Sequence, residues 1–224
     1  MNPLLDNQTT TTRSIEEVTP VQRAVAGLAF CTSGFALVIH ILTGSPLLLA
    51  LALVGLVALL GVAVVTASSP ANRVRLRRLL GKGVIVGLVG TAAYDGARWI
   101  LVQAGGLELS PFEAFPLFGR ALIGADRSGL AVEIAGIAYH LVNGVSFGVA
   151  FVIWFGHRSW WWGILFALGL EAFMLALYPG WLDPNSIAEL TQVSMVGHFA
   201  YGATLGLTAK LLGASFDGSQ PAAT

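Results

Sequence analysis

The chain has 224 residues, of which 55% are hydrophobic and only 11% charged, and its formal net charge is zero. An ordinary soluble domain carries about a quarter charged residues, so this composition excludes a soluble protein, and the balanced charge excludes a basic surface for nucleic acid. The expected partner is the lipid bilayer, and the single cysteine, Cys31, excludes an intrachain disulfide.

Both ends of the chain are poor in large apolar residues. Residues 1–20 are polar and rich in threonine, and they lack the basic, apolar and cleavage regions of a signal peptide. We expect residues 1–20 and 214–224 to be disordered tails. A single transmembrane domain is expected between them, over residues 21–213.

Six segments are long and apolar enough to cross a bilayer core of about 30 Å, which takes roughly 20 residues of helix. They are 22–43, 46–67, 83–104, 131–155, 160–178 and 192–212. The sequence therefore predicts an all-α integral membrane protein, a bundle of six transmembrane helices.

Basic residues are unevenly shared between the two sets of predicted loops. Five of them crowd the connection between the second and third spans: Arg73, Arg75, Arg77, Arg78 and Lys82. The loops on the opposite side are mainly acidic. Because Lys and Arg stay on the cytoplasmic side of membrane proteins, both termini are predicted to be cytoplasmic.

The predicted outer loop, 105–130, holds phenylalanines beside two prolines between Ser110 and Phe118. This composition is typical of a short amphipathic segment that lies at the membrane interface. A lid over a site beneath it is the alternative.

A short pattern, HxxxGxxxG, occurs in both the fourth and the sixth predicted spans. Its residues are His140, Gly144 and Gly148 in the fourth span, and His198, Gly202 and Gly206 in the sixth. On a helix, positions i, i+4 and i+8 share one face, and glycines at this spacing let membrane helices approach closely. The preceding spans each carry a carboxylate, Asp95 or Glu171. We therefore expect spans three to six to be two repeated helical hairpins that enter the membrane in the same sense.

The two carboxylates and two histidines lie at similar distances from the outer ends of their predicted spans. Ionisable groups inside a membrane face protein or water, so these side chains are expected to converge in the outer half of the bundle. Tyr94 and Ser194 are expected nearby. The predicted site for a small ligand or for protons comprises Asp95, Arg98, His140, Asn143, Glu171, His198 and Tyr201.

Other hypotheses fit the same residues. His140, His198, Glu171 and Asp95 are possible ligands of a divalent metal in a membrane enzyme, and the two histidines are possible axial ligands of haem. The metal hypothesis is weakened by Arg98, which is expected to pair with Asp95. In a further alternative, the polar network is purely structural and the chain is an accessory or scaffold subunit with a membrane-protein partner or in a homo-oligomer.

Residues 83–212 resemble the YagU-like group of bacterial inner-membrane proteins. The resemblance rests on Gly83, Gly87 and Gly90, on the His140–Gly148 helix, on Tyr178-Pro179, and on His198, Tyr201, Gly202 and Gly206. It implies a multi-pass protein of the bacterial cytoplasmic membrane and no particular activity.

Overall fold

The structure, a computed structural model, describes residues 19–177, 179–182 and 187–214, and nearly all of them are helical. No strand occurs in these ranges, which confirms the all-α prediction. The predicted tails lie outside the described residues, apart from residues 19, 20 and 214. In chain order the helices are α1 Pro20–Ala29, α2 Thr32–Thr43, α3 Leu47–Ser68, α4 Pro70–Gly105, α5 Ala114–Ile123, α6 Leu130–Phe155, α7 Trp162–Leu177, α8 Pro179–Leu182 and α9 Ile187–Leu211.

Several of these helices are long and apolar enough to cross a membrane, as expected of a membrane protein. Three described helices, α3, α4 and α6, meet this test alone, and α1 with α2 meets it as a bent pair. α3 shows the lipid-facing pattern most clearly, because almost none of its apolar core window is buried and it exposes Leu49, Leu53, Leu56 and Leu60. α7 is apolar but has only 16 residues, and α9 does not meet the test.

The first predicted span is broken into two helices that meet at an angle of 62°. At the break, the amides of Phe30 and Cys31 bond back only three residues, to Gly27 and Leu28, and the Thr32 hydroxyl bonds the Ala29 carbonyl at 2.6 Å. Tightened turns and hydroxyl back-bonding are recognised causes of helix bending. The break makes the α1–α2 segment wrap around α6 instead of running straight past it.

The third predicted span, 83–104, lies within a longer helix, because α4 starts 13 residues earlier, at Pro70. The basic cluster predicted to be a loop is therefore helical. Ser69 caps the helix by accepting a hydrogen bond from the Ala71 amide at 3.2 Å, and proline suits the first helical position. Nothing after that cap breaks the helix, since Arg and Lys are good helix formers.

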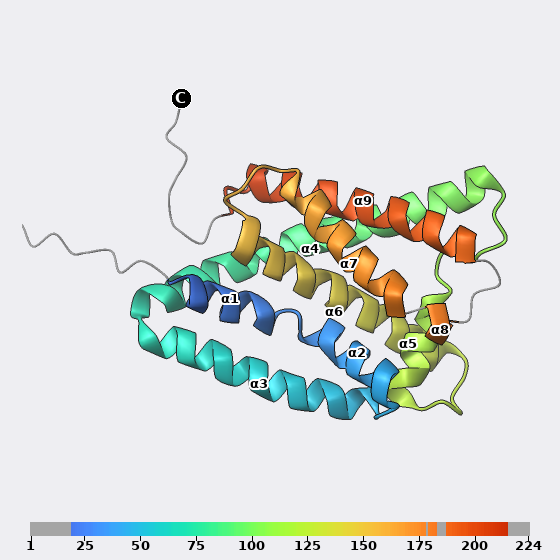
Figure 1. Cartoon of the computed structure of the whole chain (residues 1–224), viewed down its shortest axis with the longest axis horizontal. Coiled ribbons are helices and arrows are strands. Elements are labelled where there is room, and N and C mark those ends of the chain that lie inside the picture. The colour runs from blue at the N-terminus through green and yellow to red at the C-terminus, as the bar shows by residue number, and fades with distance from the viewer. Residues whose placement is uncertain (1–18, 178, 183–186, 215–224) are drawn as a thin grey trace, which may run out of the picture.

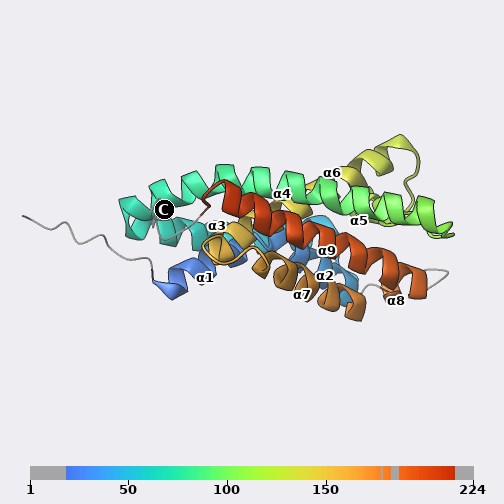
Figure 2. The same ribbon diagram turned by 90° about the horizontal axis from the view of Figure 1, so that it is seen from above.

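The helices form a bundle in which α6 lies between the α1–α2 pair on one side and α4 on the other (Figure 1). α3 lies along the outside of α1 and α2, and α9 packs on both α4 and α7. Figure 2 shows α4 and α9 running side by side along the length of the molecule. One end holds the start of α1, the α3–α4 turn and the end of α9, where Lys82 bonds the Gly213 carbonyl at 2.8 Å.

The opposite end is covered by α5, which packs on α6. Phe115 and Phe118 of α5 are buried, and the Phe118 ring stacks on Trp181 and contacts the ring of Tyr139. The segment predicted to lie at the interface or to form a lid is thus folded inward onto the bundle.

Candidate functional site

Glycines bring α4 and α6 close enough for their polar side chains to meet. A Cβ atom on Gly87 would lie 2.6 Å from the Cα atom of Val145, and one on Gly83 would lie 2.7 Å from that of Val149. From α6, Gly144 faces Thr91 and Gly148 faces Gly87. This close seam fixes the register of the two helices, because larger side chains would hold the backbones apart.

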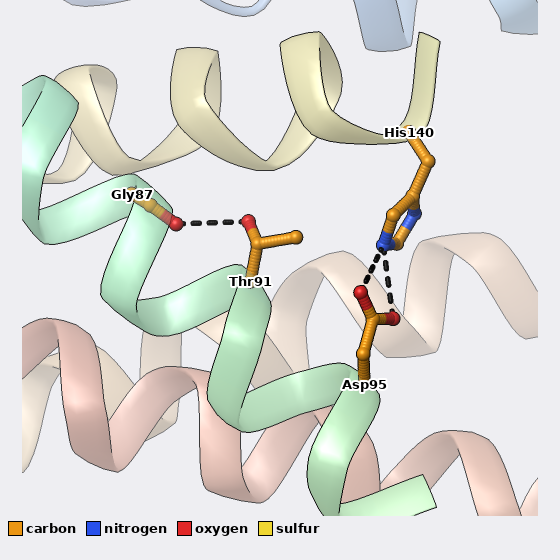
Figure 3. A network of polar contacts seen from close by, with 4 residues as sticks. All are labelled: Gly87, Thr91, Asp95 and His140. Atoms are coloured by element: carbon orange, nitrogen blue, oxygen red, sulfur yellow. Dashed lines mark hydrogen bonds and ion pairs between the residues drawn. The ribbon is translucent and has the colours of Figure 1, made fainter. Parts of the chain in front are cut away.

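Further along the same two helices, toward α5, lies a histidine–carboxylate pair. Nε2 of His140, on α6, lies 3.0 Å and 3.1 Å from the two carboxylate oxygens of Asp95, on α4. One turn earlier on α4, the Thr91 hydroxyl donates to the Gly87 carbonyl at 2.8 Å (Figure 3). Asp95 therefore orients the His140 ring, and it does not form the predicted ion pair with Arg98.

A second glycine seam joins α7 to α9. Gly202 of α9 faces Gly163 of α7, and Gly206 faces the Trp160 carbonyl just before α7 begins. The glycines of the two HxxxGxxxG patterns thus serve the same purpose, since each set packs its helix against the preceding helix of its own hairpin.

This second seam also leads to a histidine–carboxylate pair. Nδ1 of His198 lies 2.7 Å from Oε2 of Glu171, and the Ser194 hydroxyl donates to the same oxygen at 2.8 Å. The other carboxylate oxygen, Oε1, is buried and has no hydrogen-bond partner among the described residues. Glu171 is itself only 2% exposed, so half of a deeply buried carboxyl group is left unsatisfied.

Tyr94 lies between the two pairs. Its ring centroid is 5.8 Å from that of His140 and 4.9 Å from that of His198. Tyr201 stands beside it at 6.4 Å and donates its hydroxyl to the Gly144 carbonyl of α6 at 2.6 Å. Two aromatic side chains therefore join the hairpins into one polar centre, and Tyr94, expected only at the edge of the site, is in its middle.

Arg98 reaches the same centre from α4 and has no carboxylate partner among the described residues. Its side chain is buried at 6% exposure, and its guanidinium carbon lies 5.0 Å from the centroid of the Tyr94 ring. Gly197 makes room for it, since a Cβ there would lie 2.8 Å from Cγ of Arg98. The Nε atom of Arg98 has no hydrogen-bond partner in the described part of the chain.

Several of these side chains line one pocket, which has a volume of about 360 Å³. Its polar wall presents Arg98, His140, His198, Tyr94 and Ser194, whereas the paired carboxylates Asp95 and Glu171 stand behind the histidines and do not line it. Among the described residues, Glu113, just before α5, is the one carboxylate in the lining. The rest of the wall is mostly apolar and comes from α1, α2, α5, α6 and α7, so the pocket is large enough for a small molecule.

The remaining predicted residues lie around this pocket in less direct roles. Asn143 lines it, and its side-chain oxygen accepts a hydrogen bond from Ser33 of α2 at 2.7 Å. Sequence reasoning missed Phe115 and Phe118 as lining residues, although the lid alternative for their segment pointed that way. It also missed the apolar contribution of α2 and α7, for which a uniformly apolar helix gives no signal.

The metal and haem hypotheses find little support in this arrangement. Over residues 19–177, 179–182 and 187–214, no three side chains among His, Cys, Asp and Glu are placed to hold a metal ion together. The four predicted metal ligands form two separate pairs instead. For haem ligation, Nε2 of His140 is already engaged by Asp95.

Comparisons with protein-family models, with curated proteins and with solved structures find no match to this chain.

Proposed function

We propose that the chain is a multi-pass membrane protein that binds a small anionic ligand in the pocket between its two hairpins. The observation that carries the proposal is the buried Arg98, which has no carboxylate partner in the part of the chain that the structure describes. Burying a charge is costly unless it is paired. A bound anion would supply the charge and the hydrogen-bond acceptors that the protein does not.

The charged groups that line the pocket support the same proposal. The carboxylates of Asp95 and Glu171 are paired with the histidines and are not among the residues that line the pocket. Apart from Glu113 at the start of α5, the charged and polar lining groups that a ligand meets include a guanidinium, two imidazoles and hydroxyl groups, which are donors suited to a carboxylate or phosphate.

The two histidine–carboxylate pairs give the site a place to hold protons. Imidazole and carboxyl groups inside a membrane are common proton carriers, and Oε1 of Glu171 is a free acceptor. In the proposed function, a proton taken up or released with the anion resides on one of these pairs.

Replacing Arg98 with glutamine tests the proposal. We expect butyrate or inorganic phosphate, compared with chloride at equal ionic strength, to raise the melting temperature of the detergent-solubilised protein. In Arg98→Gln the apparent affinity should fall roughly ten-fold or more, because a charge-assisted hydrogen bond contributes about 1.5–3 kcal/mol. Arg120→Gln, on α5 and outside the pocket, is the matched control and should respond as the parent does. An equal response in Arg98→Gln, or none in the parent, would contradict the proposal.

We further propose a six-span topology with both termini in the cytoplasm, in a bacterial inner membrane. It adds α7 and α9 to the helices that qualify by length and composition. The basic stretch of α4 from Arg73 to Lys82 follows the α3–α4 turn, Arg158 lies in the α6–α7 connection and Lys210 near the end of α9, and the positive-inside rule favours the cytoplasm for these three positions. The resemblance to the YagU-like group agrees with this location and stays a prediction.

Single cysteines test this topology, because the native Cys31 is buried and the parent protein gives a low background. The test positions are exposed: Arg77 lies in the basic stretch of α4, Asp126 between α5 and α6, and Ser159 between α6 and α7. A membrane-impermeant maleimide should label Asp126→Cys in intact cells, and Arg77→Cys and Ser159→Cys only after permeabilisation. Labelling of Ser159→Cys in intact cells would show that α6 does not cross the membrane as proposed.

A structural role is the second candidate, favoured by the close glycine seams that hold both polar pairs. An accessory or scaffold subunit of this kind would keep its fold through the pairs and would show no response to anions. The Arg98→Gln experiment therefore separates the two functions.

A further inference from the structure

The pocket has a large apolar part besides its polar wall. From the polar wall it runs past Phe147 and Trp154 of α6, Phe166 and Leu170 of α7, and Phe35 of α2. All of these side chains are apolar or aromatic. A small inorganic ion at Arg98 would leave this part of the pocket without a complementary occupant.

The apolar part occupies a place where two helices would otherwise pack. Each hairpin consists of a carboxylate helix followed by a histidine helix, α4 with α6 and α7 with α9. The carboxylate helix α4 packs closely along the histidine helix α9 of the other hairpin, but the equivalent helices α7 and α6 make only a few contacts. The pocket lies in the space between them, and the bent α1–α2 segment forms its other wall.

The rim of this space faces the side of the bundle and not only its end. Leu28 of α1, Phe35 of α2 and Phe173 of α7 all line the pocket, yet they are 47%, 43% and 53% exposed. Exposed apolar side chains on the flank of a membrane bundle contact lipid chains. The pocket is therefore continuous with the hydrocarbon layer between α2 and α7, where Figure 1 shows α6 lying behind them.

We infer that the ligand is an anionic lipid with its head group at Arg98 and its chain between α2 and α7. This inference rests on the proposed anion site and adds the nature of the ligand. An acyl chain gains little by moving from the bilayer into an equally apolar pocket. Selectivity among lipids must therefore come from the contacts of the head group with Arg98 and the two histidines. The apolar chain limits which anions can reach these residues.

Photolabelling with a fatty acid tests this inference on the full chain in lipid nanodiscs. The probe is a diazirine-bearing palmitic acid, and the control is the corresponding alcohol, which has the same chain without the charge. Labelled peptides are identified by mass spectrometry. The lipid-facing side of α3, at Leu53 and Leu60, is the internal reference because any membrane lipid reaches it.

We expect the acid to label the peptides that contain Phe35 and Leu170 roughly ten-fold more than the alcohol does, relative to α3. Arg98→Gln should reduce labelling of these peptides by the acid to the level seen with the alcohol, and Arg120→Gln should not. Leu170→Trp, which fills the apolar part, should reduce labelling of the pocket by the acid.

The two proposals fail in different ways. If butyrate acts through Arg98 but the acid and the alcohol label the pocket equally, the anion site stands and the lipid inference is overturned. If labelling by the acid is indifferent to Leu170→Trp, the chain does not lie between α2 and α7 and the inference is again overturned. If neither butyrate nor the acid depends on Arg98, both proposals fall.

Discussion

Replacing His198 with leucine should destabilise the protein by about 3 kcal/mol, since breaking a buried ion pair leaves an uncompensated group. His198 is one of the two partners that hold Oε2 of Glu171, and the side chain of Glu171 is only 3% exposed. Without the imidazole, Ser194 alone would have to satisfy the carboxyl group. Thermal unfolding in detergent should show a fall in melting temperature of roughly 6–12 °C for a chain of this length.

The comparison with the other pair makes this prediction specific. His140→Leu should cost less, because the Asp95 side chain is 25% exposed and can be solvated in part. The double variant Glu171→Leu with His198→Leu should recover much of the stability lost by His198→Leu, because apolar side chains of similar size replace both members of the pair. Additive losses in the double variant would mean that the two side chains do not act as a pair.

Replacing Gly87 with alanine should have a comparable effect on stability through packing alone. The new methyl group would lie 2.6 Å from Cα of Val145, 2.8 Å from its carbonyl oxygen and 3.1 Å from that of Gly144. Backbone atoms cannot move aside as a side-chain end can, so α4 and α6 must separate. Overpacking of this kind typically costs about 1–3 kcal/mol.

Gly96→Ala is the matched control on the same helix. Nothing lies within 4 Å of a Cβ atom placed there, and alanine favours a helix more than glycine does. Its melting temperature should equal or slightly exceed that of the parent. Since the seam also sets the Asp95–His140 distance, Gly87→Ala should weaken the butyrate response as well. Equal stabilities for the two variants would show that the seam is not closely packed.

The polar pattern of the sequence predicted much of the site, because ionisable groups inside a membrane face protein or water. Asp95, His140, Glu171 and His198 were expected to face protein, and the structure places each carboxylate against a histidine. Spacing alone did not reveal the pairing. Arg98 lies one turn after Asp95, so an intrahelix pair was the simplest expectation, yet the close approach of α6 gives Asp95 a partner from another helix.

Helix boundaries were predicted well where apolar runs end sharply and poorly where they do not. α3 and α6 start and end within a residue of their predicted spans. The break near Phe30 was missed because the composition of the segment is apolar throughout, and the bend comes from local hydrogen bonds and from packing on α6. The start of α4 was missed because hydropathy locates the bilayer and does not locate the end of a helix.

The length of α4 also has a consequence for how the protein sits in a bilayer. Its 36 residues measure about 54 Å at 1.5 Å per residue, far more than the hydrocarbon layer of about 30 Å. The surplus is the basic stretch from Arg73 to Lys82, rigidly continuous with the part that carries Asp95 and Arg98. The arginines in the stretch from Arg73 to Lys82 belong among the lipid phosphates. The helix therefore fixes how deeply the protein sits in the bilayer. If the protein moved along the membrane normal in one direction, these guanidinium groups would enter the hydrocarbon layer. If it moved in the other direction, the leucines of α3 would enter water.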